Sequence, residues 1–466
     1  MRERRLLHRV SRHWPLLILL AAAVALRGLA WYAIQPASWF LGDSIDYVLG
    51  AVLRLPSIWR PGGYSFVLLL PLLPFHSLAL VTAVQHLLGL ATGLVVYALL
   101  VRFGLAPWLA AVSTAPALLD AYIVAVEQQL LSESLFTLLV VGAAAVLLWA
   151  RHRPPPFACL VAGGLLGLAA TTRTIGIALL PVFVVALAWR LGALRTAALL
   201  LAFSVPVALY VVKFDRTYHQ PNLTLSSGVF LYGRTTQFVD CQRMSLPDDL
   251  RRLCPGEGAA RRGELFYVFD SASPLRAVGD PAAADREALR FALAAIQAQP
   301  GGYAALVGGD LVHSLGAPGE EPLASNYQFA VTRPLPEQAR QVGRLYQRSD
   351  PGPVYAAGPV AALAAYQRVA SVPGSACLLA LLVAAAGLLL GRDHERRHLS
   401  SAVLLTAGSA LALLFLPVLT VAPDPRYRLP AIPLLCLAVP LSGLLLAGGA
   451  RVIPWPSGEL RHRSPD

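Results

Sequence analysis

The sequence predicts an all-α polytopic membrane protein with about ten transmembrane helices, cytoplasmic N- and C-termini, and an extracytoplasmic α+β domain inserted between helices 7 and 8. Three observations lead to this fold class. The 466 residues are 56% hydrophobic and only 14% charged, whereas soluble domains carry about 25% charged residues. Apolar runs long enough to cross a bilayer as helices recur along the chain. Arginines are concentrated in alternate connections between these runs.

The apolar runs are separated by short polar or proline-containing connections. They cover residues 15–35, 66–101, 107–124, 131–150, 157–172, 174–190, 195–213, 374–391, 399–421 and 429–448. The second run is too long for one simple span, so we expect a helical hairpin or re-entrant piece at LLLPLLPFHS, residues 68–77. The fifth and sixth runs are short and meet at Arg173.

The arginines orient the chain. The N-terminal tail MRERRLLHRVSRH holds five arginines and one acid, which places it in the cytoplasm. With that choice, the inner segments hold sixteen arginines against five acids, and residues 214–372 lie outside with fifteen of each. The net charge of +12 therefore reports topology and gives no reason to expect a nucleic-acid partner.

This topology divides the chain into four parts. They are a seven-helix membrane module (1–213), an extracytoplasmic domain (214–372), three C-terminal spans (373–448) and a cytoplasmic tail (449–466). In the outer domain, LTLSSGVFLYGRTTQFV (223–239) alternates in hydrophobicity and predicts one or two short strands. Helices are expected from Asp280 and again after the Pro-Gly-Gly break at 300–302. RSDPGPVYAAGP (348–359) is typical of a linker.

Two cysteines of the outer domain, Cys241 and Cys254, lie thirteen residues apart. Outside the cytoplasm a disulfide between them is expected, because that compartment is oxidising. Two free thiols are the alternative.

Several outer connections carry ionisable residues. The first, residues 40–66, holds two acids, two arginines and two tyrosines: Asp43, Asp46, Arg54, Arg60, Tyr47 and Tyr64. The others contribute Asp120, Glu127, Glu133, Arg173, Lys213, Asp424, Arg426, Tyr427 and Arg428. Each alone is explained by contact with water or by an arginine reaching to lipid headgroups. As a set they favour a shared cavity on the outer face, because charges at membrane depth are costly and usually mark a site.

The chemistry that fits such a cavity is transfer from a phosphate leaving group. A carboxylate can take a proton from an acceptor hydroxyl, and arginines can bind a phosphate and stabilise its charge as the bond to it breaks. The sequence contains no HExxH, no P-loop, no GxSxG and no clustered His or Cys ligands. A structural zinc site, an ATPase and a lipase-type hydrolase are therefore disfavoured.

Four motifs resemble those of the GT-C glycosyltransferases, polytopic enzymes that use polyprenyl-phosphate sugars and include the protein mannosyltransferases and lipid A aminoarabinose transferases. They are GDSIDY…RPGGY in the first outer connection, EQQLLSESLF (127–136), GGLLGLAATTRTIG (163–176) and RYRLPAIPLL (426–435). The resemblance covers residues 15–213 well and 423–435 more weakly. It implies a polyprenyl-phosphate sugar donor, a membrane-lipid environment and a glycan, lipid or protein acceptor.

The resemblance also assigns roles. The catalytic acid of the first outer loop matches Asp43, with Asp46 as the alternative. Glu127 or Glu133 is a second acid, for the acceptor or for a metal. The remaining residues are expected to bind substrate. Arg173 and either Arg426 or Arg428, with Lys213, are expected to hold the donor phosphate. Tyr47 is a further substrate-binding residue, and RPGGY (60–64), with Arg60 and Tyr64, is expected to shape the mouth of the site. Family members differ in their need for a divalent metal, and this loop lacks the adjacent acid pair of some relatives, so the sequence leaves dependence on a divalent metal open.

The sequence thus predicts an inverting-type hexosyl- or pentosyltransferase at the outer face of a bacterial inner membrane. The competing interpretation is a lipid-linked-sugar transporter or flippase. A transporter is expected to distribute polar groups at midplane depth in paired halves with broken helices, whereas here they cluster at one face. A third interpretation, a scaffold without chemistry, leaves the two acids at residues 43 and 46 unexplained.

Overall fold

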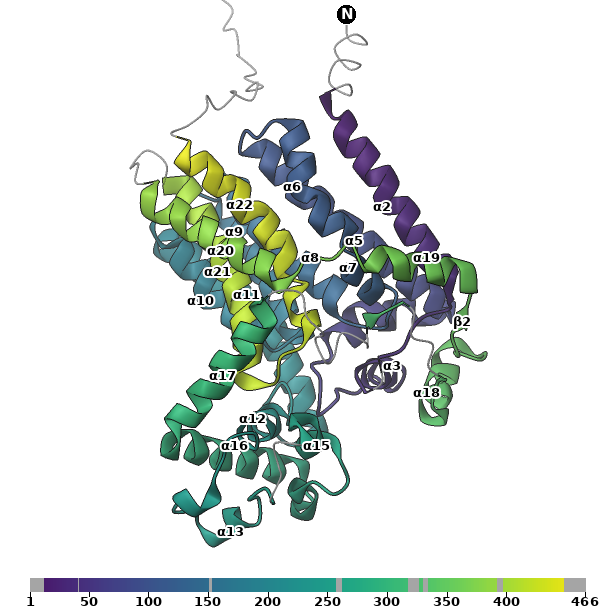
Figure 1. Cartoon of the computed structure of the whole chain (residues 1–466), viewed down its shortest axis with the longest axis vertical. Helices are drawn as coiled ribbons and strands as arrows, with labels where there is room; N and C mark the ends of the chain where they lie inside the picture. Colours follow the sequence, from purple (N-terminus) through teal and green to yellow (C-terminus); the bar gives the residue numbers. More distant parts are fainter. Residues whose placement is uncertain are drawn as a thin grey trace, which may run out of the picture.

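The protein is a helical bundle with a smaller helical domain attached at one end (Figure 1). The computed structural model describes residues 12–40, 42–150, 153–256, 262–316, 327–329, 334–391 and 397–447. Within these ranges the two strands are β1 (Ile34–Gln35) and β2 (Val354–Tyr355), which pair antiparallel.

Each predicted apolar run coincides with at least one helix. These helices are α2 (Trp14–Ala33), α5 (Leu78–Arg102), α6 (Pro107–Leu119), α7 (Ala121–Glu127), α8 (Glu133–Leu148), α9 (Pro156–Thr172), α10 (Gly176–Ala186), α11 (Ala188–Tyr218), α20 (Gly374–Leu390), α21 (Arg397–Thr420) and α22 (Ala431–Leu446). Among the described residues, α2, α5, α11 and α21 are long and apolar enough to cross a membrane, and α6 with α7, bent by 50°, makes a fifth span if the pair is one crossing. Six further apolar helices are shorter. The chain is a multi-pass helical membrane protein, and the number of ten crossings stays a prediction.

The expected irregular piece lies before α5. It consists of η1 (Ser65–Leu69), α4 (Leu70–Leu72) and η2 (Leu73–Phe75). At His76 the backbone is left-handed, with φ 48°, and Ser77 then caps α5 by accepting a hydrogen bond from the Leu80 amide at 3.1 Å. The cap supplies a partner for one of the amides that a helix start leaves without one.

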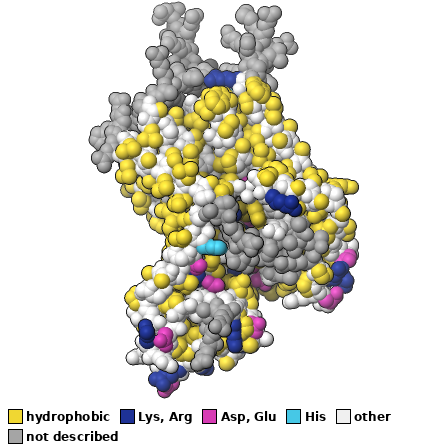
Figure 2. Space-filling model, viewed as in Figure 1, with side chains coloured by type: hydrophobic (Ala, Val, Ile, Leu, Met, Phe, Trp, Pro, Cys, Tyr) yellow, Lys and Arg dark blue, Asp and Glu magenta, His cyan; other side chains and the backbone are white. Residues whose placement is uncertain are grey.

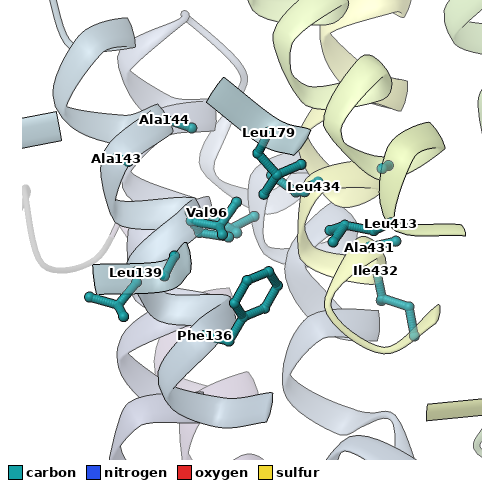
Figure 3. Packing of buried hydrophobic residues seen from close by; sticks show 14 of the residues in the cluster. Val96, Phe136, Leu139, Ala143, Ala144, Leu179, Leu413, Ala431, Ile432 and Leu434 are labelled. Atoms are coloured by element: carbon teal, nitrogen blue, oxygen red, sulfur yellow. The ribbon is translucent and has the colours of Figure 1, made fainter. Parts of the chain in front are cut away.

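The bundle core is apolar and continuous. Side chains of α5, α8 and α10, such as Val96, Phe136 and Leu179, pack against those of α21 and α22, such as Leu413 and Leu434 (Figure 3). The helices carry apolar side chains on most of their surface, as expected where one side meets lipid and the other meets neighbouring helices, with buried polar exceptions such as Arg27 of α2 and His86 of α5. Close packing in place of the hydrophobic effect then holds such helices together.

Helices α9 and α11 approach closely through small residues. A Cβ on Gly163 would lie 2.3 Å from the Leu199 carbonyl oxygen, and one on Gly167 would lie 2.4 Å from that of Phe203. The four-residue spacing puts both glycines on one face of α9, which is the small-residue contact common between membrane helices. This contact fixes the end of α9, where Arg173 follows.

Residues 214–372, which the arginine distribution predicts to lie outside and which we call the outer domain, are mainly helical in their described part. Its elements are α12 (Ser227–Thr235), η3 (Cys241–Arg243), α13 (Asp248–Arg251), α15 (Glu264–Phe269), η4 (Pro274–Val278), α16 (Pro281–Ala298) and α17 (Pro300–Leu315), followed by α18 (Glu337–Gln347) and α19 (Ala357–Gln367). Helix α16 begins where predicted, and the Asp280 carboxylate caps it by accepting from the Ala283 amide at 2.8 Å. Helix α17 begins at Pro300, so the Pro-Gly-Gly residues expected to precede it form its first turn. Hydrophobic side chains cover the bundle, while most of the visible charged side chains gather on the outer parts (Figure 2).

The strands predicted over 223–239 are wrong, and with them the α+β assignment of the domain. Helix α12 occupies this stretch. Its first amides, those of Gly228 and Val229, donate to the Asp285 carboxylate of α16 at 2.7 and 3.1 Å. A cap supplied from 57 residues away is invisible to local pattern, so alternation was mistaken for a strand. The predicted linker at 348–359 is likewise wrong in part, since it contains β2 and the start of α19.

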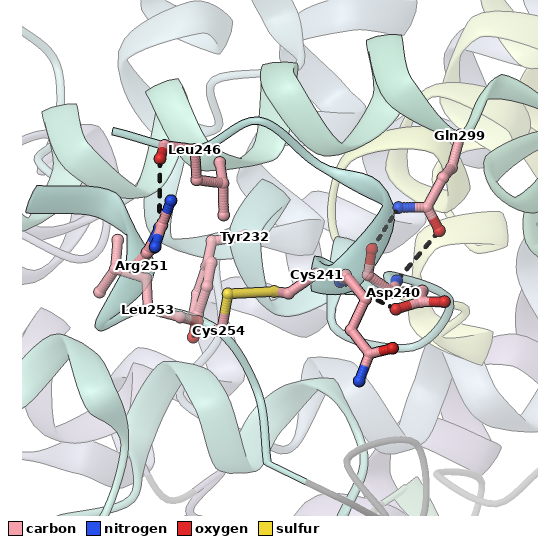
Figure 4. Close-up of a disulfide and its surroundings, with 9 residues drawn as sticks. Tyr232, Asp240, Cys241, Leu246, Arg251, Leu253, Cys254 and Gln299 are labelled. Atoms are coloured by element: carbon pink, nitrogen blue, oxygen red, sulfur yellow. Dashed lines mark hydrogen bonds between the residues drawn. A yellow bond between two sulfur atoms is a disulfide. The ribbon is translucent and has the colours of Figure 1, made fainter. Parts of the chain in front are cut away.

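Cys241 and Cys254 form the disulfide that the sequence predicts (Figure 4). The loop it closes is held at two further points. The Tyr232 hydroxyl donates to the Leu253 carbonyl at 2.6 Å, and the Gln299 side-chain amide exchanges two 3.0 Å hydrogen bonds with the Asp240 backbone. The disulfide therefore braces a loop against α12 and the junction of α16 with α17.

Candidate active site

The site begins at α3 (Asp43–Leu53), a helix in the first outer connection. Gly42 precedes it with φ +94°, a conformation that favours glycine. Asp43 and Asp46 both fall in the first turn, where the helix dipole stabilises negative charge. The Ser44 hydroxyl ties this turn to the next connection by donating to the Leu130 carbonyl at 3.0 Å. The local fold thus presents two carboxylates at a fixed helix end.

Both oxygens of Asp43 are held by arginines. Arg60 Nε lies 2.7 Å from Oδ1, and Arg426 Nη1 lies 2.7 Å from Oδ2. Asp43 is only 4% exposed and Arg426 only 5%. Burial alone would raise the pKa of Asp43, but the two guanidinium groups outweigh it and hold the pKa well below its usual range. Asp43 is therefore ionised at every physiological pH.

A row of alternating charge continues from Asp43 into the second outer connection. Arg426 Nε lies 3.8 Å from Glu133 Oε1 and 3.5 Å from Asp424 Oδ2. Arg173 pairs with the same Glu133 oxygen. Glu133 is 3% exposed, and its Oε2 has no hydrogen-bond partner within the described part of the chain. We call Asp43, Arg426, Glu133 and Arg173 the site row.

Aromatic rings frame the row. The Arg426 guanidinium lies 4.7 Å from the Phe40 ring centre and 5.3 Å from that of Tyr427. The Arg173 guanidinium also contacts this ring, 5.5 Å from the Tyr427 ring centre. Cation–π contacts of this kind stabilise desolvated cations. Tyr427 thus links the two arginines that the resemblance assigns to the donor phosphate.

Asp46 has different surroundings from Asp43. It is half-buried, accepts a hydrogen bond from Ser57 and lies near Arg60. Burial raises its pKa to about 6, against the lowering effects of the Ser57 hydrogen bond and the Arg60 charge. The two acids that the sequence could not rank thus differ: one is a permanent anion clamped by cations, and the other can exchange a proton near neutral pH.

Both acids line the same cavity, whose volume is about 670 Å³. Its wall is rich in aromatic and polar side chains from five parts of the chain. They include Trp39, Phe40, Trp59, Arg60, Gln129, Phe230, Phe269, Tyr327, Phe329, Tyr355, Asp424, Arg426 and Tyr427. A large cavity with a few convergent polar groups is the usual form of a ligand site.

The wall contains residues that sequence reasoning missed. The wall residues from the outer domain, such as Phe230, Tyr327 and Tyr355, belong to no recognisable sequence motif. β1 and β2 bring Tyr355 beside the first outer connection, and Phe40 stacks on Tyr327 with ring centres 5.6 Å apart. Pairing between segments some 290 residues apart leaves no local signal.

Tyr47 and Tyr64 lie behind the cavity and do not line it. Their rings meet edge to face at 4.9 Å, the Tyr47 hydroxyl donates to Ser132 Oγ at 3.1 Å, and the Tyr64 hydroxyl donates to Gln85. Gly63 allows this packing, because a Cβ there would lie 2.6 Å from the Thr171 backbone. The two tyrosines therefore support α3 from behind. Neither lines the cavity, although the sequence predicts that both bind substrate.

Glu127 also lies outside the cavity wall. Its Oε2 lies 2.8 Å from Arg27 Nε and 2.8 Å from His86 Nδ1. Arg27 also donates to the Leu118 carbonyl at 2.6 Å, and His86 Nε2 contacts Gln128 at 2.8 Å. We call Glu127, Arg27 and His86 the buried triad. Arg27 was detectable as a charge within an apolar run.

Arg428 and Lys213 are separated from Arg426. Arg428 lines a second cavity of about 360 Å³, together with Arg262, His313 and the apolar Leu414 and Val418 of α21; Asp424 and Tyr427 line both cavities. Lys213 lies over the Phe66 ring at 5.0 Å and lines neither cavity.

No family model and no curated protein matches the chain. Two solved structures align with it, the crystal structures of ArnT from Cupriavidus metallidurans in the apo state and bound to undecaprenyl phosphate. They share 15% and 16% identity, with 93% of this chain and 77% of the other covered and TM-scores of 0.37 and 0.36. Since such a distant likeness assigns no activity, function is argued from the residues of the site.

Proposed function

We propose that this chain is a membrane glycosyltransferase that moves one sugar from a polyprenyl-phosphate donor onto an acceptor at the outer face of a bacterial inner membrane. One observation carries the proposal: Asp43 is clamped by Arg60 and Arg426 in the wall of a 670 Å³ cavity lined by aromatic rings. A carboxylate can accept the proton of the acceptor, and guanidinium groups can bind the phosphate of the donor. Aromatic rings can pack their flat faces against a sugar. The sugar is a hexose or pentose, and the acceptor is a glycan, lipid or protein of the cell envelope.

The second cavity supports a path for the lipid. Leu414 and Val418 give it an apolar wall on α21, and its charged lining combines the cations Arg262 and Arg428 with the carboxylates of Glu264, Asp310 and Asp424. A polyprenyl phosphate needs both features, because its chain prefers an apolar surface and its headgroup a cation. Tyr427 borders both cavities. We therefore place the phosphate between Arg428 and Arg426, with the sugar in the larger cavity.

The reaction is a displacement at the anomeric carbon with inversion. The acceptor oxygen forms the new bond to that carbon and loses its proton to an aspartate of the first outer loop. The bond from carbon to phosphate oxygen breaks, and the polyprenyl phosphate leaves with the electron pair. Arg426 and Arg428 stabilise the negative charge that develops on this leaving group.

A divalent metal is not assigned a role in these steps. Within the described part of the chain, no group of three or more His, Cys, Asp or Glu side chains is placed to hold a metal ion. The acids of the site row are instead engaged by arginines. In the proposed reaction the guanidinium groups of the site meet the charge on the phosphate.

The test uses the full-length protein purified in detergent with a panel of undecaprenyl-phosphate and undecaprenyl-diphosphate sugars. We expect one donor to be cleaved, with release of the lipid phosphate measured by mass spectrometry. Arg428→Gln should raise KM for that donor by about tenfold, as expected for the loss of a charged hydrogen bond worth ~1.5–3 kcal/mol. Arg251→Gln, at an exposed position of the outer domain, is the matched control. An intact panel, with a labelled donor crossing proteoliposome bilayers, would replace the transferase by a transporter.

A further inference from the structure

We propose that Asp46 is the general base of the transfer and that Asp43 is a positioning residue that orients Arg60 and Arg426. This inference rests on the proposed function and goes beyond it, because it divides two roles between acids that the family resemblance assigns mainly to Asp43. It is carried by the difference in how the two carboxylates are held within one cavity.

The partners of Asp43 leave it poorly suited to accept a proton. Each of its oxygens lies 2.7 Å from a different arginine nitrogen, and the side chain is almost fully buried. A carboxylate so clamped favours its charged form strongly, so protonation in a transition state is unfavourable. The same clamp has an obvious use, since it fixes two long arginine side chains whose remaining donors can meet a phosphate.

Asp46 has the access that Asp43 lacks. It stands three residues further along α3, so the helix turns it to a neighbouring face, and it lines the cavity while remaining half-buried. Among the described residues, no arginine forms an ion pair with Asp46. The arginines of the site pair with other acids: Arg60 and Arg426 with Asp43, and Arg173 with Glu133. An acceptor seated in the cavity can therefore reach this carboxylate.

The charged and titratable groups around Asp46 come from four elements. Asp43 on its own helix raises its pKa, and Arg60 in the following loop lowers it. On α11, Tyr218 faces it, although the Tyr218 hydroxyl donates to the Pro56 carbonyl at 2.6 Å. On α18, which packs against α3, Arg340 and Arg344 are paired with Asp350 and Glu337.

The balance of these groups suits a base. Burial raises the pKa of Asp46 to about 6, so the group is ionised at neutral pH yet basic enough to take a proton. General bases work best when their pKa lies near the operating pH. In the step, the acceptor O–H bond breaks to Asp46, the acceptor oxygen bonds to the anomeric carbon, and the polyprenyl phosphate leaves. Asp46 then returns the proton to water.

The experiment compares pH–rate profiles of the wild type, Asp46→Asn, Asp46→Glu and Asp43→Asn on the undecaprenyl-phosphate sugar that the wild type cleaves. We expect the wild-type kcat to fall tenfold per pH unit below about 6. Asp46→Asn should lose about 10²–10⁴-fold in kcat and lose this acidic limb, with KM for the donor nearly unchanged. Asp46→Glu should restore part of the rate and the limb.

Asp43→Asn should keep the acidic limb while raising KM for the donor, because its arginines lose their anchor. If this variant fails to fold, the Asp46→Asn profile decides alone. Asp249→Asn, at an exposed acid of the outer domain paired with Arg290, controls for the loss of one carboxylate. A wild-type rate in Asp46→Asn, or an acidic limb that survives in it, overturns the inference and leaves the transferase standing. A wild type that cleaves no donor overturns both.

Discussion

The site row and the buried triad each join a buried glutamate to arginine, and their two glutamates are close in the chain, yet the clusters differ in what surrounds them. Glu133 and Glu127 are six residues apart and both line a cavity of only about 30 Å³ between them. Glu133 keeps one oxygen without a partner among the described residues, and one of its two arginines, Arg426, lines the large cavity. Both oxygens of Glu127 are taken by Arg27 and His86. A buried ion pair therefore indicates a site only where it borders space for a ligand.

The largest expected effect is on stability, in the buried triad. Glu127→Gln leaves the Arg27 guanidinium buried without its counter-ion, which typically costs about 3–5 kcal/mol. We expect Tm in detergent to fall by several degrees, measured by thermal unfolding, while kcat per folded molecule stays within about threefold, because Glu127 lies outside the cavity wall. The double variant Arg27→Met/Glu127→Leu, which removes both charges, should recover much of the loss. A selective loss of kcat in Glu127→Gln would instead move Glu127 into the site.

This comparison also shows what the sequence can and cannot predict. The apolar runs predict the helices well, because length and hydropathy are local properties. The clustering of polar residues predicts a shared site, and four of these residues form one row of ion pairs. Glu127, Lys213 and Arg428 lie elsewhere. Sequence could not separate Glu127 from Glu133, since the partners that distinguish them, Arg27 and His86, come from other helices 100 and 41 residues away.

The second prediction changes catalysis more than stability. Arg426→Lys keeps a positive charge near Asp43 but loses the planar fork that reaches Asp43 and Glu133 together. Lysine is a point charge and does not replace arginine at such a position. We expect donor turnover to fall by about 10²-fold, the usual effect of removing one stabilising donor, with a Tm change smaller than that of Glu127→Gln. Arg27→Lys in the buried triad is the matched control, and an equal loss of turnover there would erase the distinction between the clusters.

The smallest effect separates the two aspartates by the sign of their contribution to stability. The raised pKa of Asp46 means that the folded state binds a proton more tightly than the unfolded state, whose value is near 3.8. Stability from this group is thus fully present below about 4 and is lost as the pH rises through about 6. Asp46→Asn should therefore raise Tm by about 1–3 °C above pH 6 and leave it nearly unchanged at pH 4.

Asp43 has the opposite sign. Its pKa is lowered, so its contribution is present above the unfolded value and is lost only in strong acid. Asp43→Asn should accordingly lower Tm at neutral pH, where it leaves two arginines beside a neutral amide. Thermal scans of both variants at pH 4 and pH 7.5 measure the contrast. Tm shifts of the same sign at pH 7.5 would contradict it and would mean that both carboxylates are held in the same way, which would also remove the physical reason for giving them different roles.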